Sequence, residues 1–305
     1  MGTAGWLIAL ALCGSGPALG ATCSCAGTPL LTAIDTSARE KGQLFISYVT
    51  EDHRISDLVS GSRDVRDETG RDRESFSQVV SASYALTDRW AVSALVSHIE
   101  HRRTIRSSQL GETRTSGIGD SVILARYTPI VITPFNRHEW ALGLGLRIPS
   151  ADDDLADGFI LSEDMQPSTG ARGTILWTGY TYAFNQAATV VFNATANYTD
   201  NQSNDRQYAF GDEVSLFAGV GHNMGPRFSY SVGLRYRRTD ADSRGKFDIP
   251  NTGGEWLDFV PAVQWSLTDR LDLGLSGRIP IARDLNGALQ FTTSYSYGFS
   301  LSYGF

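Results

Sequence analysis

The stretch at residues 290–305 constrains the fold more than any other part of the chain. It reads Gln-Phe-Thr-Thr-Ser-Tyr-Ser-Tyr-Gly-Phe-Ser-Leu-Ser-Tyr-Gly-Phe, and every second residue from Phe291 to Phe305, except Thr293, is large and mostly aromatic. A period of two is that of a β-strand with one apolar face and one small polar face. Strands of soluble β-sandwiches alternate in the same way, but so many aromatic residues on one face favour a strand whose outer side meets lipid.

The aromatic ending also predicts how the chain assembles. Bacterial outer-membrane barrels close with such a strand, and a final Phe preceded by alternating aromatic residues resembles the signal that their assembly machinery reads. We therefore expect Tyr303 and Phe305 to form an assembly signal, with the barrel-assembly machinery as a partner. The predicted fold class is all-β, a transmembrane antiparallel up-and-down β-barrel in the outer membrane of a Gram-negative bacterium.

Composition excludes two other classes of protein. Beyond the N-terminus no apolar run approaches the roughly 20 residues that a spanning helix needs. Hydrophobic residues make up 41% of the chain, an ordinary content that still suits a barrel, because small polar residues on the inner face dilute the lipid-facing ones. The net charge of -7 argues against nucleic acid as a partner, since a basic surface would be expected.

The start of the chain reads as a targeting segment. A short apolar run is followed by Gly, Ser and Pro and then by small residues suited to cleavage, which predicts a signal peptide over residues 1–21. Residues 22–41 would then be an N-terminal periplasmic segment that begins with Cys23 and Cys25. Two thiols one residue apart are weak candidates for a soft-metal site or for a strained disulfide, or they are incidental. No other cofactor is expected.

From residue 42 to residue 305 the pattern is that of a single barrel domain. Apolar residues alternate in about twelve segments that are long enough to cross a membrane when tilted. The connections between segments are alternately long and polar or short, so we expect short periplasmic turns and long extracellular loops. The expected strands span 42–51, 76–87, 90–100, 118–129, 139–149, 171–184, 187–199, 211–223, 228–238, 255–267, 271–281 and 290–305.

If the apolar parity of each strand faces lipid, the other parity lines the lumen and marks a candidate solute path. Charged side chains there either border an aqueous passage or pair across the lumen as a polar core. Arginines outnumber aspartates among them, which predicts a net positive lumen that favours anions. Glu213 and Arg172 lie nearer strand ends and are expected at the bases of loops. The predicted lumen-lining residues are Arg147, Arg235, Arg237, Asp258, Asp272, Arg278, Asn193 and Asn197.

Three short segments carry a resemblance to a known family. The Ser-Gly-Ile-Gly-Asp-Ser run at 116–121, the Leu-Gly-Leu-Arg-Ile-Pro-Ser run at 144–150 and the Gln-Pro-Ser-Thr-Gly-Ala-Arg run at 166–172 resemble motifs of barrels in the MetA-pathway phenol-degradation family of outer-membrane transporters. Ser150 and Ala151 stand where that family has Thr and Gly, and Ser168 replaces a Gly. The resemblance implies transport of hydrophobic or aromatic compounds, whereas the glycines by themselves indicate only strand kinks or bulges.

Two functions of different classes follow. The first is an outer-membrane channel or transporter for passive uptake or efflux of small molecules. The alternative is a non-conducting barrel that docks a periplasmic redox or binding protein through residues 23–41. We do not expect an enzyme. The chain has five histidines but contains neither a Gly-x-Ser-x-Gly nor a His-Glu-x-x-His motif. The remaining expected partners are outer-membrane lipid, lipopolysaccharide and a small-molecule solute.

Overall fold

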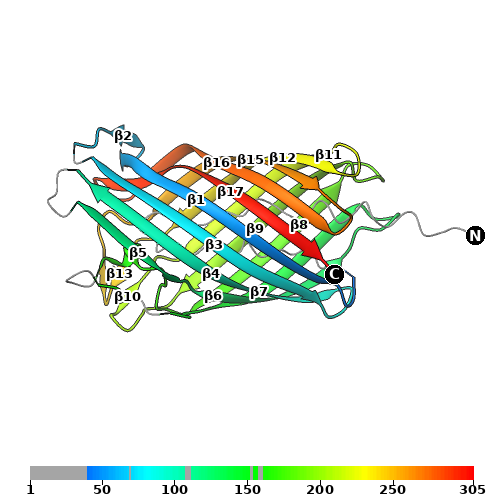
Figure 1. Ribbon diagram of the computed structural model, residues 1–305, viewed down its shortest axis with the longest axis horizontal. Helices are drawn as coiled ribbons and strands as arrows, with labels where there is room; N and C mark the ends of the chain where they lie inside the picture. Colours follow the sequence, from blue (N-terminus) through cyan, green and yellow to red (C-terminus); the bar gives the residue numbers. More distant parts are fainter. Residues whose placement is uncertain (1–39, 69, 107–110, 152–153, 157–160) are drawn as a thin grey trace, which may run out of the picture.

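The computed structural model describes residues 40–68, 70–106, 111–151, 154–156 and 161–305. In this part of the chain, antiparallel strands form a closed twelve-stranded barrel (Figure 1). Each strand pairs with its neighbour in sequence, which is the up-and-down topology. The predicted fold class and the number of strands are therefore confirmed.

The barrel strands are longer than most strands of soluble proteins. One of the twelve barrel strands is interrupted and consists of two consecutive segments, β5 and β6, which both pair with β4. The strands are β1 (Leu44–Ser60), β3 (Arg71–Ala85), β4 (Trp90–Ile105), β5 (Glu112–Ile118), β6 (Ser121–Ile130), β7 (His138–Ile148), β8 (Gly173–Ala183), β9 (Val190–Asn201), β11 (Glu213–Asn223), β12 (Phe228–Thr239), β15 (Gly254–Ser266), β16 (Leu271–Leu285) and β17 (Gln290–Gly304).

The last strand closes the barrel against the first. β17 pairs antiparallel with β1, in a register that sets Phe45 opposite Gly304. The amide of Phe305 donates to the carbonyl of Leu44 at 2.9 Å, which extends the seam to the end of the chain. Closure satisfies the backbone groups that an open edge would expose to lipid, where each bare group costs several kcal/mol.

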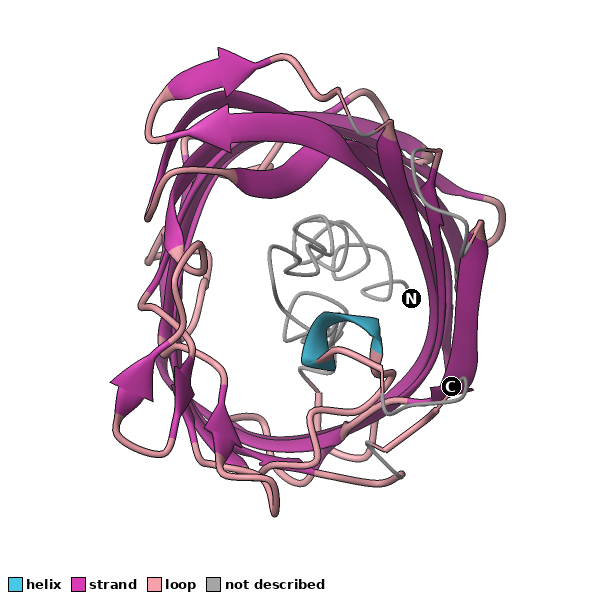
Figure 2. Cartoon of the chain, turned by 90° about the vertical axis from the view of Figure 1, so that its left-hand side faces the viewer, coloured by secondary structure: helices cyan, strands magenta, loops and turns pink. Residues whose placement is uncertain are grey.

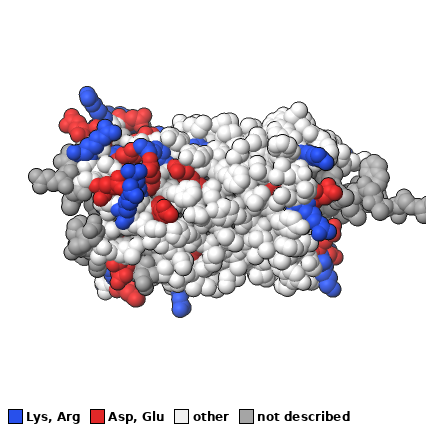
Figure 3. All heavy atoms as spheres, viewed as in Figure 1, with Lys and Arg blue, Asp and Glu red and all other residues white. Residues whose placement is uncertain are grey.

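The alternation of residues along the strands separates an apolar outer face from an inner face. On β7, Leu144 is 57% exposed on the outside, whereas Arg147 is 3% exposed on the inside. Charged side chains on the face shown in Figure 3 gather at the two ends of the barrel and leave a largely uncharged band between them. This band is what lipid contact requires of the outer wall.

Aromatic pairs mark the end of the barrel that carries the short turns. Trp90 and Tyr127 lie with ring centroids 4.8 Å apart, and Tyr303 and Phe305 lie 4.7 Å apart. Aromatic girdles of this kind form where the hydrocarbon region meets water, because the rings are amphipathic.

A bulge divides the strand that was expected at residues 118–129. His98 pairs with Ile118, but Leu95 pairs with Val122, so one extra residue is accommodated at Gly119 and Asp120. The extra residue reverses the parity of the inward side chains between β5 and β6. A Cβ on Gly119 would lie 2.4 Å from the Ser97 hydroxyl and 2.8 Å from Ile99, so only glycine fits at this position.

Several strands extend into segments that were expected to be loops. Most of the polar stretch at residues 51–74 belongs to β1 and β3, which continue beyond the apolar band. The charges in this stretch form pairs across the strands, because Arg54 on β1 contacts both Asp72 and Glu74 on β3. Ion pairs between neighbouring strands let charged residues continue a sheet in water, which a prediction based on apolar alternation misses.

A small second sheet stands at the long-loop end of the barrel. It consists of β10 (Tyr208–Ala209), β13 (Ser243–Arg244) and β14 (Phe247–Asp248). Tyr208 and Phe210 pack together with Ile249, and Asp242 accepts hydrogen bonds from the Tyr208 hydroxyl and the Gly211 amide. These contacts give the loops a core of their own. The remaining short strand, β2 (Arg63–Val65), pairs with the end of β1.

Several predictions for the start of the chain lie outside the described residues. They are the signal peptide at 1–21, nearly all of the periplasmic segment at 22–41, and the pair Cys23 and Cys25. Among the residues that are described, the structure contains no helix with the length and apolar character needed to cross a membrane.

The orientation of the barrel is a testable prediction. Epitope tags inserted at residues 63–71 or 240–245 should be labelled on intact cells, because these segments lie at the end that carries the long loops (Figure 1). Tags at Asp88 or Asp269, in the short turns, should be labelled only after the outer membrane is permeabilised. Antibody labelling of intact cells tests both, and surface labelling at Asp88 would reverse the orientation.

Candidate functional site

The inner wall of the barrel holds a network of buried charges centred on Arg235. Its Nη2 lies 3.8 Å from a carboxylate oxygen of Glu213, and its Nη1 lies 3.8 Å from Asp258. Its Nε donates to Ser215 at 3.1 Å. Arg237 shares Glu213 at 3.7 Å and stacks over the Trp256 ring, 3.8 Å from its centroid. Strands β11, β12 and β15 thus carry one connected set of charges.

Glu213 was expected at the base of a loop, and this expectation is wrong. Its side chain is buried on the inner wall, where it bridges the two arginines of β12. It is the first residue of β11 and has inward parity, so its side chain points into the wall although it stands at the end of the strand. Arg172, by contrast, is exposed beside the start of β8.

A second chain of polar contacts crosses the seam of the barrel. Arg278 on β16 donates to Ser296 on β17 at 2.9 Å and contacts Nδ1 of His53 at 2.8 Å. The Nε2 atom of His53 in turn lies 3.0 Å from Glu51. His53 and Glu51 were not among the predicted lumen residues, because His53 lies beyond the strand expected at 42–51 and Glu51 is the last residue of that strand. Their parity along β1, odd like that of Phe45, would have identified them.

The other predicted lumen residues also have inward parity. Asp272 is half-buried and accepts a hydrogen bond from Ser266 at 2.6 Å. Asn193 and Asn197 are half-buried on β9, and the Thr181 hydroxyl lies 2.9 Å from the Asn193 side-chain oxygen. Whether any of these side chains contacts a passing solute stays a prediction.

Buried charges of the two signs nearly balance on the described inner wall. The buried arginines are Arg73, Arg126, Arg147, Arg235, Arg237 and Arg278, and the buried carboxylates are Glu51, Asp120, Glu139, Glu213 and Asp258. A net positive lumen therefore stays a prediction, and we expect any preference for anions to be weak, because arginines and carboxylates pair locally.

An apolar stripe occupies another part of the same wall. It runs across neighbouring strands from β1 through β3, β4 and β6 to β8, and the inward glycines of β7 leave room for the large side chains beside them. A Cβ on Gly145 would lie 3.0 Å from Leu124 and 3.1 Å from a backbone oxygen. The stripe consists of Val49, Val79, Leu95, Val122, Leu124 and Ile175, with Trp177 packed against them.

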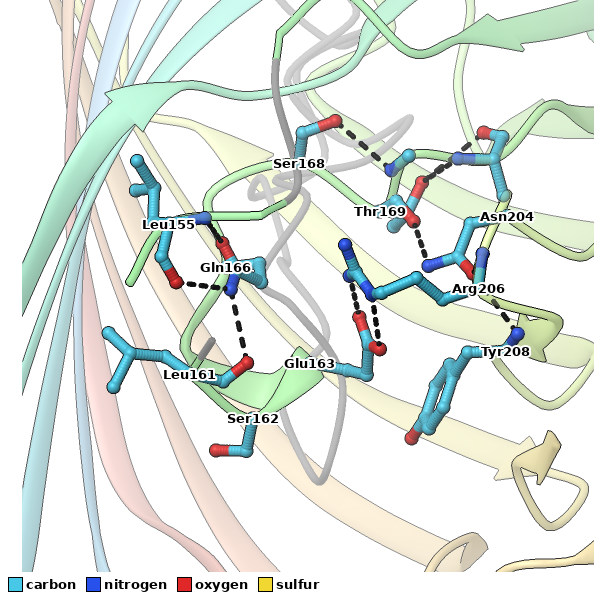
Figure 4. Close-up of polar contacts among 12 residues, drawn as sticks. Leu155, Leu161, Ser162, Glu163, Gln166, Ser168, Thr169, Asn204, Arg206 and Tyr208 are labelled. Carbon is cyan, nitrogen blue, oxygen red and sulfur yellow. Dashed lines mark hydrogen bonds and ion pairs between the residues drawn. The ribbon is translucent and has the colours of Figure 1, made fainter. Parts of the chain in front are cut away.

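The segment between β7 and β8 was expected to be an extracellular loop, but it folds into the barrel. We call its described residues 154–156 and 161–172 the inner loop. The 3₁₀ helix η2 (Glu163–Met165) of this loop lies inside the ring of strands (Figure 2). Gln166 ties the loop together, because its side chain bonds both backbone groups of Leu155 and the carbonyl of Leu161 at 3.0–3.1 Å (Figure 4). Both Met165 and Gln166 are fully buried.

Two acidic residues in η2 hold the inner loop from opposite sides. Glu163 receives Nε and Nη2 of Arg206 at 3.1 and 2.5 Å (Figure 4) and lies 3.4 Å from Arg244. Asp164 turns the other way, toward the barrel wall, where Arg73 donates to it at 3.0 Å. Burial raises the pKa of Asp164, but the arginines around it and a bond from Ser162 outweigh burial and hold the pKa below its usual range.

The inner loop also runs along β5 and ends at a buried carboxylate. The Thr115 hydroxyl donates to the carbonyl of Met165 at 2.6 Å. Asp120, which is 0% exposed, accepts the hydroxyls of Ser168 and Thr169 at 2.6 and 2.5 Å and the Thr169 amide at 3.2 Å. Its other neighbour is the Nε of Arg147, 3.5 Å away on β7. Asp120 therefore joins the barrel wall, including β7, to the C-terminal end of the loop.

Comparison with known proteins places this arrangement in a family. The family model described as the MetA-pathway of phenol degradation matches residues 98–284, which is more than half of the 305 residues. The chain belongs to this family. No curated protein sequence matches the chain.

Solved structures agree on the fold of this MetA-pathway family member. The outer membrane channel from Pseudomonas putida F1 is 14% identical, with a TM-score of 0.68 over 88% of this chain and 97% of that one. The beta domain of the Bordetella autotransporter BrkA is 11% identical, with a TM-score of 0.53 over 87% of this chain and 100% of that one. The protein is an outer-membrane β-barrel of the Gram-negative type.

The three segments that resembled the MetA-pathway family meet at one place. Asp120 comes from the first segment, Arg147 from the second, and Ser168 and Thr169 from the third. Ser168 stands where the family motif has Gly, and its hydroxyl is one of the donors to Asp120. Sequence reasoning assigned these segments to strand kinks and missed the carboxylate. The available signal was a charged residue, Asp120, within an expected membrane-spanning strand.

Proposed function

We propose that the protein is a channel for passive passage of small hydrophobic or aromatic molecules across the outer membrane. The apolar stripe carries this proposal, because its six core side chains, 0–6% exposed, make this part of the inner wall apolar, whereas the interior of a barrel for sugars or ions is polar. The description of the family supports it, and so does the similarity of the barrel to the outer membrane channel from Pseudomonas putida F1.

Uptake of an aromatic probe tests the proposal. Cells with an intact lipopolysaccharide layer that express the protein should take up radiolabelled naphthalene several-fold faster than cells without it. Changing Val49, Val79 and Val122 to Thr, which preserves volume but adds hydroxyls to the stripe, should remove most of the gain. Uptake is normalised to the amount of folded barrel in the membrane.

A matched variant separates the stripe from general damage to the barrel. Val80, Val92 and Val96 lie on β3 and β4 like the stripe but face outward, with 36–52% exposure. Changing these three to Thr should leave naphthalene uptake per folded barrel unchanged. Equal losses in the two triple variants would reject the role of the stripe, and no gain from the wild-type protein would favour the docking alternative through residues 23–41.

We also propose that the protein is not an enzyme. Ser75 and His101 approach to 2.5 Å across β3 and β4, a pair that sequence patterns did not show. Both side chains are almost fully buried beside the inner loop, at 3% and 1% exposure. A nucleophile must be reachable by its substrate, so this pair supports the wall rather than chemistry. The assembly machinery, lipopolysaccharide and a periplasmic protein remain proposed partners.

A further inference from the structure

Three arginines of the inner wall converge on a single carboxylate of the inner loop. Arg73 lies 3.0 Å, Arg71 3.5 Å and Arg103 4.0 Å from oxygens of Asp164. Arg71 and Arg73 come from the start of β3, and Arg103 comes from the facing end of β4, so neighbouring strands present the three guanidiniums together. We call Arg71, Arg73 and Arg103 the arginine cluster.

The cluster is positioned independently of Asp164. The Arg71 guanidinium lies over the Phe291 ring of β17, 4.7 Å from its centroid, and its backbone amide donates to Asp67 at 2.7 Å. Arg73 is 3% exposed in the wall beside His101. These contacts belong to the barrel, so Arg71 and Arg73 stay in place when the side chain of the loop leaves, and the pairing of β3 with β4 keeps Arg103 opposite Arg73.

Donors remain on the cluster that Asp164 does not satisfy. Asp164 Oδ2 accepts a hydrogen bond from Arg73 and forms an ion pair with Arg71 at 3.5 Å. Arg103 lies 4.0 Å from Oδ1, which is too long for a hydrogen bond. Arg103 donates instead to the Ser162 hydroxyl at 3.2 Å, while its Nε is buried with no hydrogen-bond partner among the described residues. A free carboxylate can turn both of its oxygens toward the guanidinium N–H groups. Asp164 does not, because its short side chain is fixed to η2.

We propose that the arginine cluster is a binding site for small organic carboxylates, in which Asp164 occupies the place of the solute carboxylate. The inference deepens the proposed function and rests on it, because the solute meets these side chains inside the channel. An aromatic or aliphatic carboxylate displaces Asp164 from the wall and pairs with the guanidiniums. Asp164 then competes with the solute from within the same chain. The longer it occupies the cluster, the lower the apparent affinity for the solute.

Calorimetric titration of the refolded full-length protein in detergent with sodium benzoate tests the site. Asp164→Asn should bind benzoate at least about tenfold more tightly than the wild-type protein, because the competitor loses its charge. Benzyl alcohol, a neutral probe of similar shape, should show no such gain. Benzoate affinity in Asp164→Asn should fall as salt rises, since charges drive binding.

The neighbouring carboxylate supplies the matched control. Glu163 also anchors η2 but contacts Arg206 and Arg244 instead of the cluster, so Glu163→Gln should leave benzoate affinity at the wild-type value. Adding Arg73→Gln to Asp164→Asn should remove the gain. A gain in Glu163→Gln equal to that in Asp164→Asn, or benzoate binding no better than benzyl alcohol, would overturn the site.

The outcome is separable from that of the proposed channel. Benzoate affinity is read in detergent without transport, whereas channel function is read as uptake of uncharged naphthalene. If Asp164→Asn does not refold, Arg103→Gln in the wild-type background serves instead, and it should weaken benzoate binding several-fold. Unchanged affinity in that folded variant would equally overturn the site.

Discussion

Replacing Asp120 by Ala is expected to lower the free energy of unfolding by about 3–5 kcal/mol, the cost of removing one partner of a buried ion pair. The carboxylate is fully buried and accepts bonds from Ser168 and Thr169. Its loss leaves the Ser168 hydroxyl without this acceptor, leaves the Thr169 hydroxyl with the Ala171 carbonyl at 3.2 Å, and takes from Arg147 the carboxylate 3.5 Å away. Urea unfolding of the barrel in lipid vesicles measures the change.

Two further variants make the Asp120 prediction specific. Glu100→Ala removes a carboxylate that is 53% exposed on the neighbouring β4, so it should change stability by no more than about 0.5 kcal/mol. Asp120→Asn keeps the shape but not the charge and should fall between the two. If Asp120→Ala costs no more than Glu100→Ala, the carboxylate does not hold the inner loop to the wall.

Deleting Phe305 should reduce the amount of folded barrel in the membrane far more than Ser302→Ala. Phe305 adds the last backbone bond of the β1–β17 seam, and its ring packs edge-on against Tyr303 at 4.7 Å. Ser302 has inward parity on the same strand and is half-buried, so its replacement leaves the seam and the lipid face intact. Heat-modified migration on gels gives the folded fraction in cell envelopes.

Folding in vitro separates the two roles assigned to Phe305. In vesicles without assembly machinery, the deletion should lower the folded yield relative to the wild-type protein less than it does in cells. Only the seam bond and the ring contact are lost there. An equally large defect in vesicles would make Phe305 a stability residue rather than an assembly signal. Equal yields of the deletion and Ser302→Ala in cells would contradict both roles.

Strand parity was readable from the sequence, because a strand has only two faces and a barrel assigns one to lipid and one to the lumen. Alternation in the segment around Leu144 and Arg147 therefore predicted which side chain points inward, and the same reasoning placed Arg235 and Asp258. Closure by residues 290–305 followed from the same rule, since an open edge in lipid is too costly. Strand ends were less readable, because charged residues such as Arg54 and Glu74 continue the sheet in water by pairing across strands.

The tertiary structure alone decided where the connection between β7 and β8 goes. Polar loops have no period that separates an inward path from an outward one, so residues 161–172 gave no sign that they fold into the barrel. Their position depends on partners distant in sequence, such as Asp120 for Thr169 and Arg73 for Asp164. A buried carboxylate is stable only where several donors meet it, and which donors meet is settled when the barrel closes.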